Sequence, residues 1–151
     1  MIYADASTLR LEQGAWFERR SSVDAQWEKE DTIYWYYGWQ TEAMKALYQL
    51  ESLQENWDGY QSPAPSKDII ERAKKLLLAI DIDNITAPHI VPLADGGIQF
   101  EWRVNSRELE FSILPGEPIE FLKAENGRPI DEGPLPSTNS QIKVLVSWLF
   151  C

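Results

Sequence analysis

Apolar side chains recur at two different periods along this chain, which separates a helical part from a part made of strands. In the helical part, the first clear apolar stripe follows Thr41 and lies among charged and amide residues. Its members are Ala43, Met44, Leu47, Leu50 and Leu53. This spacing predicts an amphipathic helix that begins with Thr41 as its N-cap and ends near Glu55.

Two further helices are predicted by the same criterion. Ser66 can cap the second helix, in which apolar residues follow at positions i, i+4, i+7, i+8 and i+11. These residues are Ile69, Ala73, Leu76, Leu77 and Ile80. The third helix lies towards the C-terminal end of the sequence, with Ser137, Thr138 or Asn139 as its cap. Its apolar stripe consists of Ile142, Leu145, Val146 and Leu149.

Between the second and third helices the period changes to two, as expected of half-buried strands. Apolar and polar residues alternate over residues 98–104 and again over residues 107–113. If Asn105 and Ser106 form a two-residue turn, Glu101 faces Glu110 across the two strands. The large apolar residues of both strands then share one face of the sheet.

Two more strands complete the predicted sheet. The segment from His89 to Leu93 is short, and Pro92 places it at a sheet edge or a strand end. The other strand runs from Pro118 to Ala124 and is closed by an Asn-Gly turn. We interpret residues 127–139, GRPIDEGPLPSTN, as a loop because Gly and Pro are frequent there. The predicted fold is an α+β two-layer sandwich, in which helices pack on one face of a three- or four-stranded antiparallel sheet with a C-terminal helix.

The first 40 residues are rich in aromatic side chains and show no clean period. We expect a single domain over residues 1–151, with residues 1–40 as an aromatic-rich N-terminal arm and residues 41–151 as the α+β core. The arm either covers the sheet or presents Trp35 and Trp39 as anchors for a partner. Covering is favoured because exposed aromatic patches are rare on monomers.

Charge and composition narrow the classes of partner. The chain has 24 Asp and Glu against 14 Lys and Arg, and its formal net charge is −10. This charge repels phosphate backbones, so direct binding of nucleic acid is disfavoured. It fits either a simple solvated surface or docking on a partner protein that has a basic surface.

The sequence has one cysteine, Cys151, and one histidine, His89. An intramolecular disulfide needs two cysteines and a zinc site needs several Cys or His ligands, so we expect neither of these and no cofactor. The sequence begins without the pattern of a signal peptide, and no apolar run is long enough to cross a membrane. We therefore expect a cytoplasmic protein that does not bind membranes.

The pentapeptide Asn56-Trp57-Asp58-Gly59-Tyr60 lies between the first two predicted helices. Gly59 permits positive φ, Asp58 can accept hydrogen bonds from nearby backbone amides, and the two aromatic rings can be buried on either side. The segment offers one carboxylate without an evident base beside it. We interpret it as a structural corner between two helices rather than a reaction centre.

The predicted register places two like charges, Glu101 and Glu110, opposite each other on the polar face of the sheet, which is destabilising unless they are compensated. Further carboxylates expected nearby are Glu108, Glu120 and Asp95. Three interpretations remain open, in this order. The pair is solvated or neutralised by Arg103 or Lys123, the face around Glu101, Glu108 and Glu110 binds a basic protein, or it holds a divalent metal ion.

An enzyme is the rival class of function. A carboxylate- or metal-dependent hydrolase could use Asp58, Asp95, Glu101 and Glu110, because two carboxyls held at a suitable separation with different pKa values suffice for general acid–base catalysis. However, the sequence shows nothing that would desolvate one of them selectively, and it has no serine or cysteine in a nucleophile motif. We therefore assign no catalytic residue and no metal ligand.

The motifs NWDGY, PHIVP and DGGIQFEW follow one another within residues 40–125. This set resembles a family of small bacterial proteins of unassigned function, which share an N-W-D-G-Y corner and a D-G-G-I-x-x-E-W strand. The resemblance implies a bacterial or phage origin and a neighbourhood of mobile elements, where small acidic proteins act as antitoxins, immunity factors or inhibitors. It implies no activity, cofactor or catalytic residue.

These observations favour an acidic protein-binding module of the inhibitor, antitoxin or immunity type over a hydrolase. The expected docking surface is the polar sheet face around Glu101, Glu108 and Glu110, with aromatic anchors from the N-terminal arm. The C-terminal segment VLVSWLFC offers a second contact, through which the chain could form a homo-oligomer.

Overall fold

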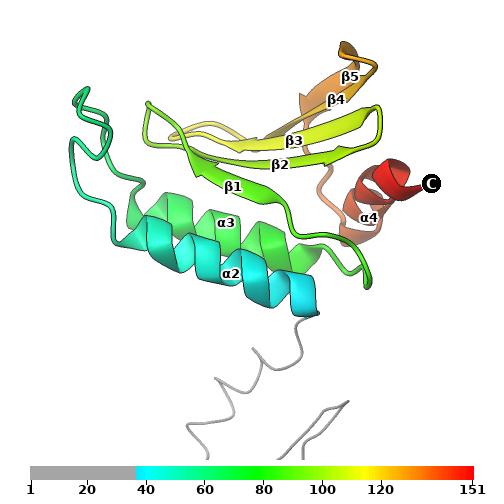
Figure 1. Cartoon of the computed structure of the whole chain (residues 1–151), viewed down its shortest axis with the longest axis horizontal. Coiled ribbons are helices and arrows are strands. Elements are labelled where there is room, and N and C mark those ends of the chain that lie inside the picture. Colours follow the sequence, from blue (N-terminus) through cyan, green and yellow to red (C-terminus); the bar gives the residue numbers. More distant parts are fainter. Residues whose placement is uncertain (1–36) are drawn as a thin grey trace, which may run out of the picture. The chain divides into compact units, whose positions relative to one another are not determined.

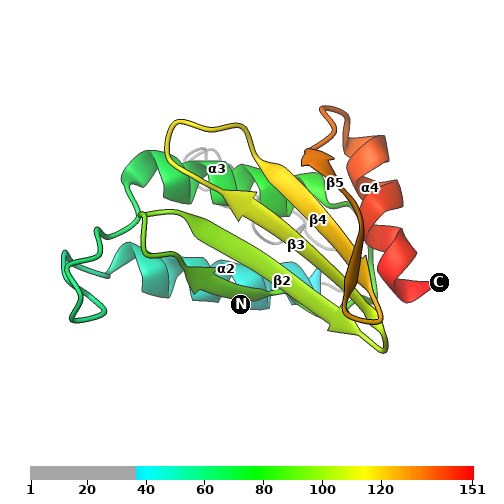
Figure 2. The same cartoon turned by 90° about the horizontal axis from the view of Figure 1, so that it is seen from above.

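Three helices cover one face of an antiparallel sheet in the computed structural model, which describes residues 37–151 (Figure 1). This arrangement confirms the predicted α+β class with a C-terminal helix. Figure 2 shows the sheet from above, with the helices behind it and at one end. The other face of the sheet carries no helix among the described residues. Residues 1–36, most of the predicted arm, lie outside the described part of the chain.

Helix α2 (Gly38–Glu51) begins before the predicted N-cap and ends before the predicted C-terminus. Its N-cap is Tyr37, whose backbone N–H donates to Oε1 of Gln40 at 3.0 Å. The assignment of Thr41 as the cap was wrong because the group that satisfies the helix start is a glutamine side chain within the first turn. Helix α2 therefore begins three residues before Thr41.

Helix α3 (Lys67–Ala79) confirms the second predicted helix. Ser66 is its N-cap, and the Ser66 hydroxyl oxygen accepts a hydrogen bond from the backbone N–H of Ile69 at 3.2 Å. The helix runs antiparallel to α2 (Figure 1). Its apolar stripe is buried against the sheet and α2, as the periodicity predicted.

In residues 37–151 the sheet contains five strands, and each one pairs with its neighbour in the chain in antiparallel orientation. The strands are β1 (His89–Pro92), β2 (Ile98–Val104), β3 (Arg107–Ile113), β4 (Glu120–Glu125) and β5 (Arg128–Pro134). The predicted register of the central hairpin is confirmed, because Glu101 pairs with Glu110 and Trp102 with Leu109. Strand β1 is an edge strand, as Pro92 indicated.

Strand β5 contradicts the prediction of a loop over residues 127–139 and raises the strand count from three or four to five. Asn126 and Gly127 both have positive φ, at 54° and 75°, which is the backbone of a two-residue hairpin turn. Pro129 and Gly133 gave this segment the composition of a loop. Both residue types are unfavourable in a central strand but are tolerated at a sheet edge.

The core lies between the helices and the inner faces of the central strands. The ring of Trp102 packs edge-on against those of Phe100 and Phe111, with centroids 6.4 and 5.5 Å apart. Other fully buried side chains include Leu47, Ile69, Ile70, Leu77, Ile98, Leu109 and Ile113. Side chains alternate along a strand, so the polar residues between these apolar ones point to the opposite face of the sheet.

Helix α4 (Asn139–Ser147) is capped by Thr138 and leads into a 3₁₀ turn, Trp148–Phe150. Its predicted apolar stripe is buried within the chain's own core. Val144 and Phe150 stay exposed, at 71% and 36%. A homo-oligomer through this segment would rest on these two side chains, and it stays a prediction. None of the helices described in residues 37–151 has both the length and the apolar character needed to span a membrane.

Candidate functional site

Polar side chains line the sheet face opposite the helices, here called the open face. The pairing register sets one residue from each strand in a row straight across the sheet. From β1 to β5, this central row consists of His89, Glu101, Glu110, Leu122 and Glu132. Residues directly opposite one another on neighbouring strands share a face of the sheet. The row therefore places one imidazole, three carboxylates and one leucine side chain on the open face.

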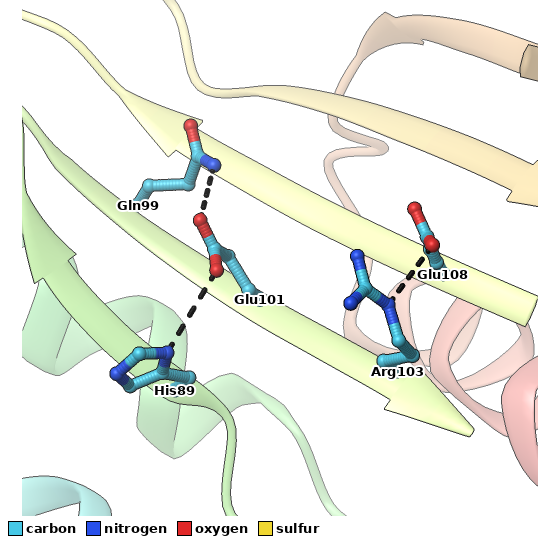
Figure 3. Close-up of polar contacts among 5 residues, drawn as sticks. All are labelled: His89, Gln99, Glu101, Arg103 and Glu108. Atoms are coloured by element: carbon cyan, nitrogen blue, oxygen red, sulfur yellow. Dashed lines mark hydrogen bonds and ion pairs between the residues drawn. The ribbon is translucent and has the colours of Figure 1, made fainter. Parts of the chain in front are cut away.

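Two of the glutamates predicted to bind a partner already have local partners on the open face (Figure 3). The Nε of Arg103 donates to Oε2 of Glu108 at 2.9 Å. Glu101 accepts a hydrogen bond from Nε2 of Gln99 at 2.7 Å, and its other oxygen lies 3.8 Å from Nδ1 of His89. Arg103 was predicted to neutralise the facing pair of Glu101 and Glu110, but it forms its ion pair with Glu108.

Glu110 differs from these two residues because it has no ion-pair partner among residues 37–151. It lies opposite Glu101 and two positions from Glu108 on the same strand. Burial, followed by repulsion from Glu101 and Glu108, raises the pKa of its carboxyl, and Arg103 opposes the shift. The folded chain thus holds a carboxyl group whose ionised form would be stabilised by a cation from outside.

A shallow hollow lies on the β3–β5 side of the open face. Its lining includes Glu110, Ser112, Glu120, Leu122 and Glu132. Glu120 and Glu132 are exposed, and the described part of the chain gives neither of them an ion-pair partner. Sequence analysis missed Leu122 and Glu132 because their alignment depends on β5. The Asn-Gly dipeptide at residues 126–127 was the signal that could have found them.

The open face is strongly acidic. Five carboxylates lie on it, and in residues 37–151 Arg103 is its one permanently cationic side chain. These carboxylates belong to Glu101, Glu108, Glu110, Glu120 and Glu132. Lys123 was the other residue predicted to neutralise them, and this was wrong. Strand alternation turns Lys123 to the helix side, where its Nζ lies 4.5 Å from the ring centroid of Trp148.

The four carboxylates considered for a hydrolase do not form one cluster. Glu101 and Glu110 are neighbours on the open face, whereas Asp95 lies in the β1–β2 turn and accepts a hydrogen bond from the Gly97 N–H at 2.9 Å. Asp58 lies in the loop between α2 and α3. Within residues 37–151, no three His, Cys, Asp or Glu side chains are grouped in a way that could hold a metal ion.

The NWDGY corner lies in a loop that is closed by its own hydrogen bonds. One carboxylate oxygen of Asp58 accepts from the backbone N–H of Tyr60 at 2.8 Å and of Ser62 at 3.3 Å, and the other accepts from the Ser62 hydroxyl at 2.5 Å. The Ser62 hydroxyl is the main cause of the lowered pKa of Asp58. The loop is also closed by the Asn56 N–H, which donates to the Ser62 carbonyl at 2.9 Å. Asp58 therefore serves to close the loop.

The predicted burial of both aromatic rings in this corner was wrong. The side chain of Tyr60 is 87% exposed. Trp57 is only partly buried, and its Nε1 donates to the Pro63 carbonyl at 3.1 Å. Positive φ at Gly59 (78°) and Gln61 (68°) turns the chain. Backbone conformation and hydrogen bonds, rather than ring packing, shape the corner.

The aromatic anchors predicted for a partner are Trp35 and Trp39. Trp39 is only 6% exposed, and its Nε1 donates to the carbonyl of Ile82 at 2.7 Å. It is a core residue of α2 and cannot act as an exposed anchor. Trp35 lies outside the described residues.

No protein-family model matches this chain, and no curated protein or solved structure shows significant similarity to it. The resemblance to small bacterial proteins with an N-W-D-G-Y corner therefore stays a prediction. Function has to be argued from the open face itself.

Proposed function

We propose that this chain is a cytoplasmic, acidic protein-binding module of the inhibitor, antitoxin or immunity type, whose partner carries a basic surface. The observation that carries the proposal is the open face, on which carboxylates outnumber cations and which no helix of residues 37–151 covers. A surface of one sign attracts a partner of the opposite sign and accelerates the encounter.

The docking surface that we propose is centred between β3 and β5. Glu101 and Glu108 already contact cationic or amide side chains of their own chain, so their carboxylates have less to gain from a partner. Glu110, Glu120 and Glu132 have no such ion pairs in the described residues. An Arg or Lys of the partner would pair with these carboxylates, and its aliphatic part would pack on Leu122.

A carboxylate-dependent hydrolase is the alternative, and one observation favours it. The raised pKa of Glu110 beside Glu101 resembles the divided protonation of a catalytic carboxyl pair. Binding is the better-supported function because the hollow that Glu101 and Glu110 line together holds only ≈ 170 Å³, whereas small-molecule sites are usually larger and enclose the ligand. For the metal-dependent form, calorimetric titration with Mg²⁺, Mn²⁺ and Ca²⁺ is the discriminating test, and heat with a thermal shift would favour it.

The binding proposal is tested by affinity capture from the native host, identification of the captured protein, and titration of the purified pair. The variant is Glu110→Lys/Glu132→Lys. The matched control is Glu42→Lys/Glu71→Lys, which changes the net charge equally on exposed positions of α2 and α3. We expect at least a tenfold loss of affinity for the variant, which corresponds to about 1.4 kcal/mol.

The control should bind within about twofold of the wild type, because long-range attraction by net charge is screened by salt. Thermal unfolding of both double variants shows whether they fold. If the folded Glu110→Lys/Glu132→Lys protein binds its partner like the wild type, the open face is not the docking surface. An equal loss in variant and control would mean that net charge alone drives binding.

A further inference from the structure

Both edge strands of the sheet have prolines at or near their two ends. Pro88 directly precedes β1 and Pro92 ends it, while Pro129 and Pro134 lie within β5. In an antiparallel ladder, hydrogen-bonded and non-hydrogen-bonded pairs alternate, and in the second kind the backbone N–H and C=O point away from the neighbouring strand. On an edge strand, these groups face outwards, where a further strand could add.

On β1 the outward-facing positions can be assigned from one hydrogen bond. The Leu93 N–H donates to the Gly97 carbonyl at 2.9 Å, so this pair is hydrogen-bonded and the next pair, which contains Pro92, is not. Counting back by two, the backbone of Ile90 and then of Pro88 also faces outwards. Because proline has no N–H, Ile90 supplies the one outward donor between the two prolines.

The same arrangement recurs on β5. The Leu135 N–H donates to the Ile119 carbonyl at 2.8 Å, so Pro134 and, two residues before it, Glu132 face outwards. At the other end of β5, the residues flanking the two-residue turn form a hydrogen-bonded pair, so Pro129 next to them also faces outwards. A register shift against β4 adds a bulge between these positions. Glu132 therefore supplies the outward donor between the two prolines.

We infer that these four prolines prevent both sheet edges from pairing with a strand of a second copy of this chain. An added strand would meet an N–H at only one of the three outward positions on each edge, so the carbonyls facing the two prolines would lack a donor. The bulge on β5 twists that edge away from a flat partner as well. This inference does not depend on the proposed function, because it concerns the edges of the sheet and not its open face.

The test restores the missing donors. Pro129→Thr/Pro134→Thr adds two outward N–H groups at exposed positions of β5, in a residue type that favours strands. Pro92→Thr adds one outward N–H on β1, at a partly exposed position. The matched control is Pro118→Thr, which removes an exposed proline from the β3–β4 loop without creating an edge donor. Light scattering over a concentration series measures the mass of each protein.

We expect the mass of the edge variants to rise at least twofold above that of the wild type as concentration increases, while the control follows the wild type. Equal masses for all of these folded proteins at every concentration would overturn the inference. If an edge variant does not unfold cooperatively on heating, amide exchange of the wild type decides instead. Exchange at Ile90 and Glu132 should be independent of protein concentration, and protection that grows with concentration would mean that the edges pair in spite of the prolines.

Discussion

Glu101 and Glu110 face each other across β2 and β3, and burial together with this repulsion raises the pKa of Glu110 above its usual value of 4.5. A carboxyl whose pKa is raised by folding destabilises the protein when it is ionised. This effect is fully present above the folded-state pKa and disappears as the pH falls below the unfolded-state value. We expect Glu110→Gln to raise the free energy of unfolding at neutral pH by about 0.2–1 kcal/mol, the usual size of a cross-strand pair.

Urea denaturation at neutral pH and near pH 4 checks this expectation, because the difference between Glu110→Gln and the wild type should shrink in acid. Glu120→Gln is the matched control, since Glu120 is an exposed glutamate on the same face. If both variants change stability equally at both pH values, repulsion between Glu101 and Glu110 is not the cause.

If the proposed function holds, the same pKa shift predicts that partner binding releases protons at pH values near or below the raised pKa of Glu110. A cation placed beside Glu110 favours its ionised form and lowers its pKa, so affinity should rise as the pH rises through the raised pKa. Calorimetry in two buffers with different ionisation enthalpies measures the released protons. Glu110→Gln should abolish the release, and a release that persists in this variant would assign it to another group.

The side chain of Gln40 is only 4% exposed, and its amide links helix α2 to helix α3. Its Nε2 donates to the carbonyls of Leu77 and Ile80, both at 3.0 Å. Gln40→Ala leaves these groups without their donor, so we expect a loss of about 1–3 kcal/mol in the free energy of unfolding. Gln40→Glu should lose more as the pH rises, because a carboxylate would face two carbonyl oxygens. Urea denaturation measures both, with exposed Gln49→Ala as a control that should change little.

Gly97 follows the β1–β2 turn and lies close to the backbone of β3. A Cβ at this position would lie 2.6 Å from the carbonyl oxygen of Ile113, and backbone must move to admit it. We expect Gly97→Ala to destabilise the protein by about 1–3 kcal/mol, as overpacking does. Gly38→Ala is the control, because nothing lies within 4 Å of its added Cβ. Thermal unfolding that gave equal midpoints for the two variants would contradict this account.

Tyr60 and Asp58, two residues of the NWDGY corner, should differ in their contribution to stability. Tyr60→Ala should change the free energy of unfolding by less than about 0.5 kcal/mol, because the ring is 87% exposed. Asp58→Ala should lower the thermal midpoint, and this loss should be larger at neutral pH than in acid. The pKa of Asp58 is lowered by folding, so its stabilising contribution is present above the usual value of 3.8 and is lost as the pH falls through the lowered pKa. Loss of partner binding in folded Tyr60→Ala would make the corner part of an interface.

The central hairpin could be predicted down to its register because its alternation is strict and its turn is short. A slip by one residue would have moved Trp102 and Leu109 to the solvent face, so one register was favoured over all others. Ser66 was found as a cap for a similar reason, since its role depends only on the residues that follow it. Local rules sufficed wherever the decisive contact was local in sequence.

The features that the sequence did not predict depend on contacts that cannot be inferred from composition. Strand β5 is held by pairing with β4, and an edge position makes Pro129 acceptable there. Lys123 faces Trp148, which comes from a distant part of the chain, so its side of the sheet was misjudged. Tyr60 was expected to be buried because aromatic rings usually are, but backbone conformation and hydrogen bonds shape its loop.

The strand order in the sheet is also the order of the strands along the chain. Each strand therefore finds its partner after a turn or a short loop, and two of these turns, at residues 105–106 and 126–127, contain two residues each. Closing short loops loses little chain entropy, and domains rich in such contacts fold faster than those with distant pairings. The sheet can therefore assemble one hairpin after another, so that a newly synthesised chain leaves its inner strands unpaired only briefly.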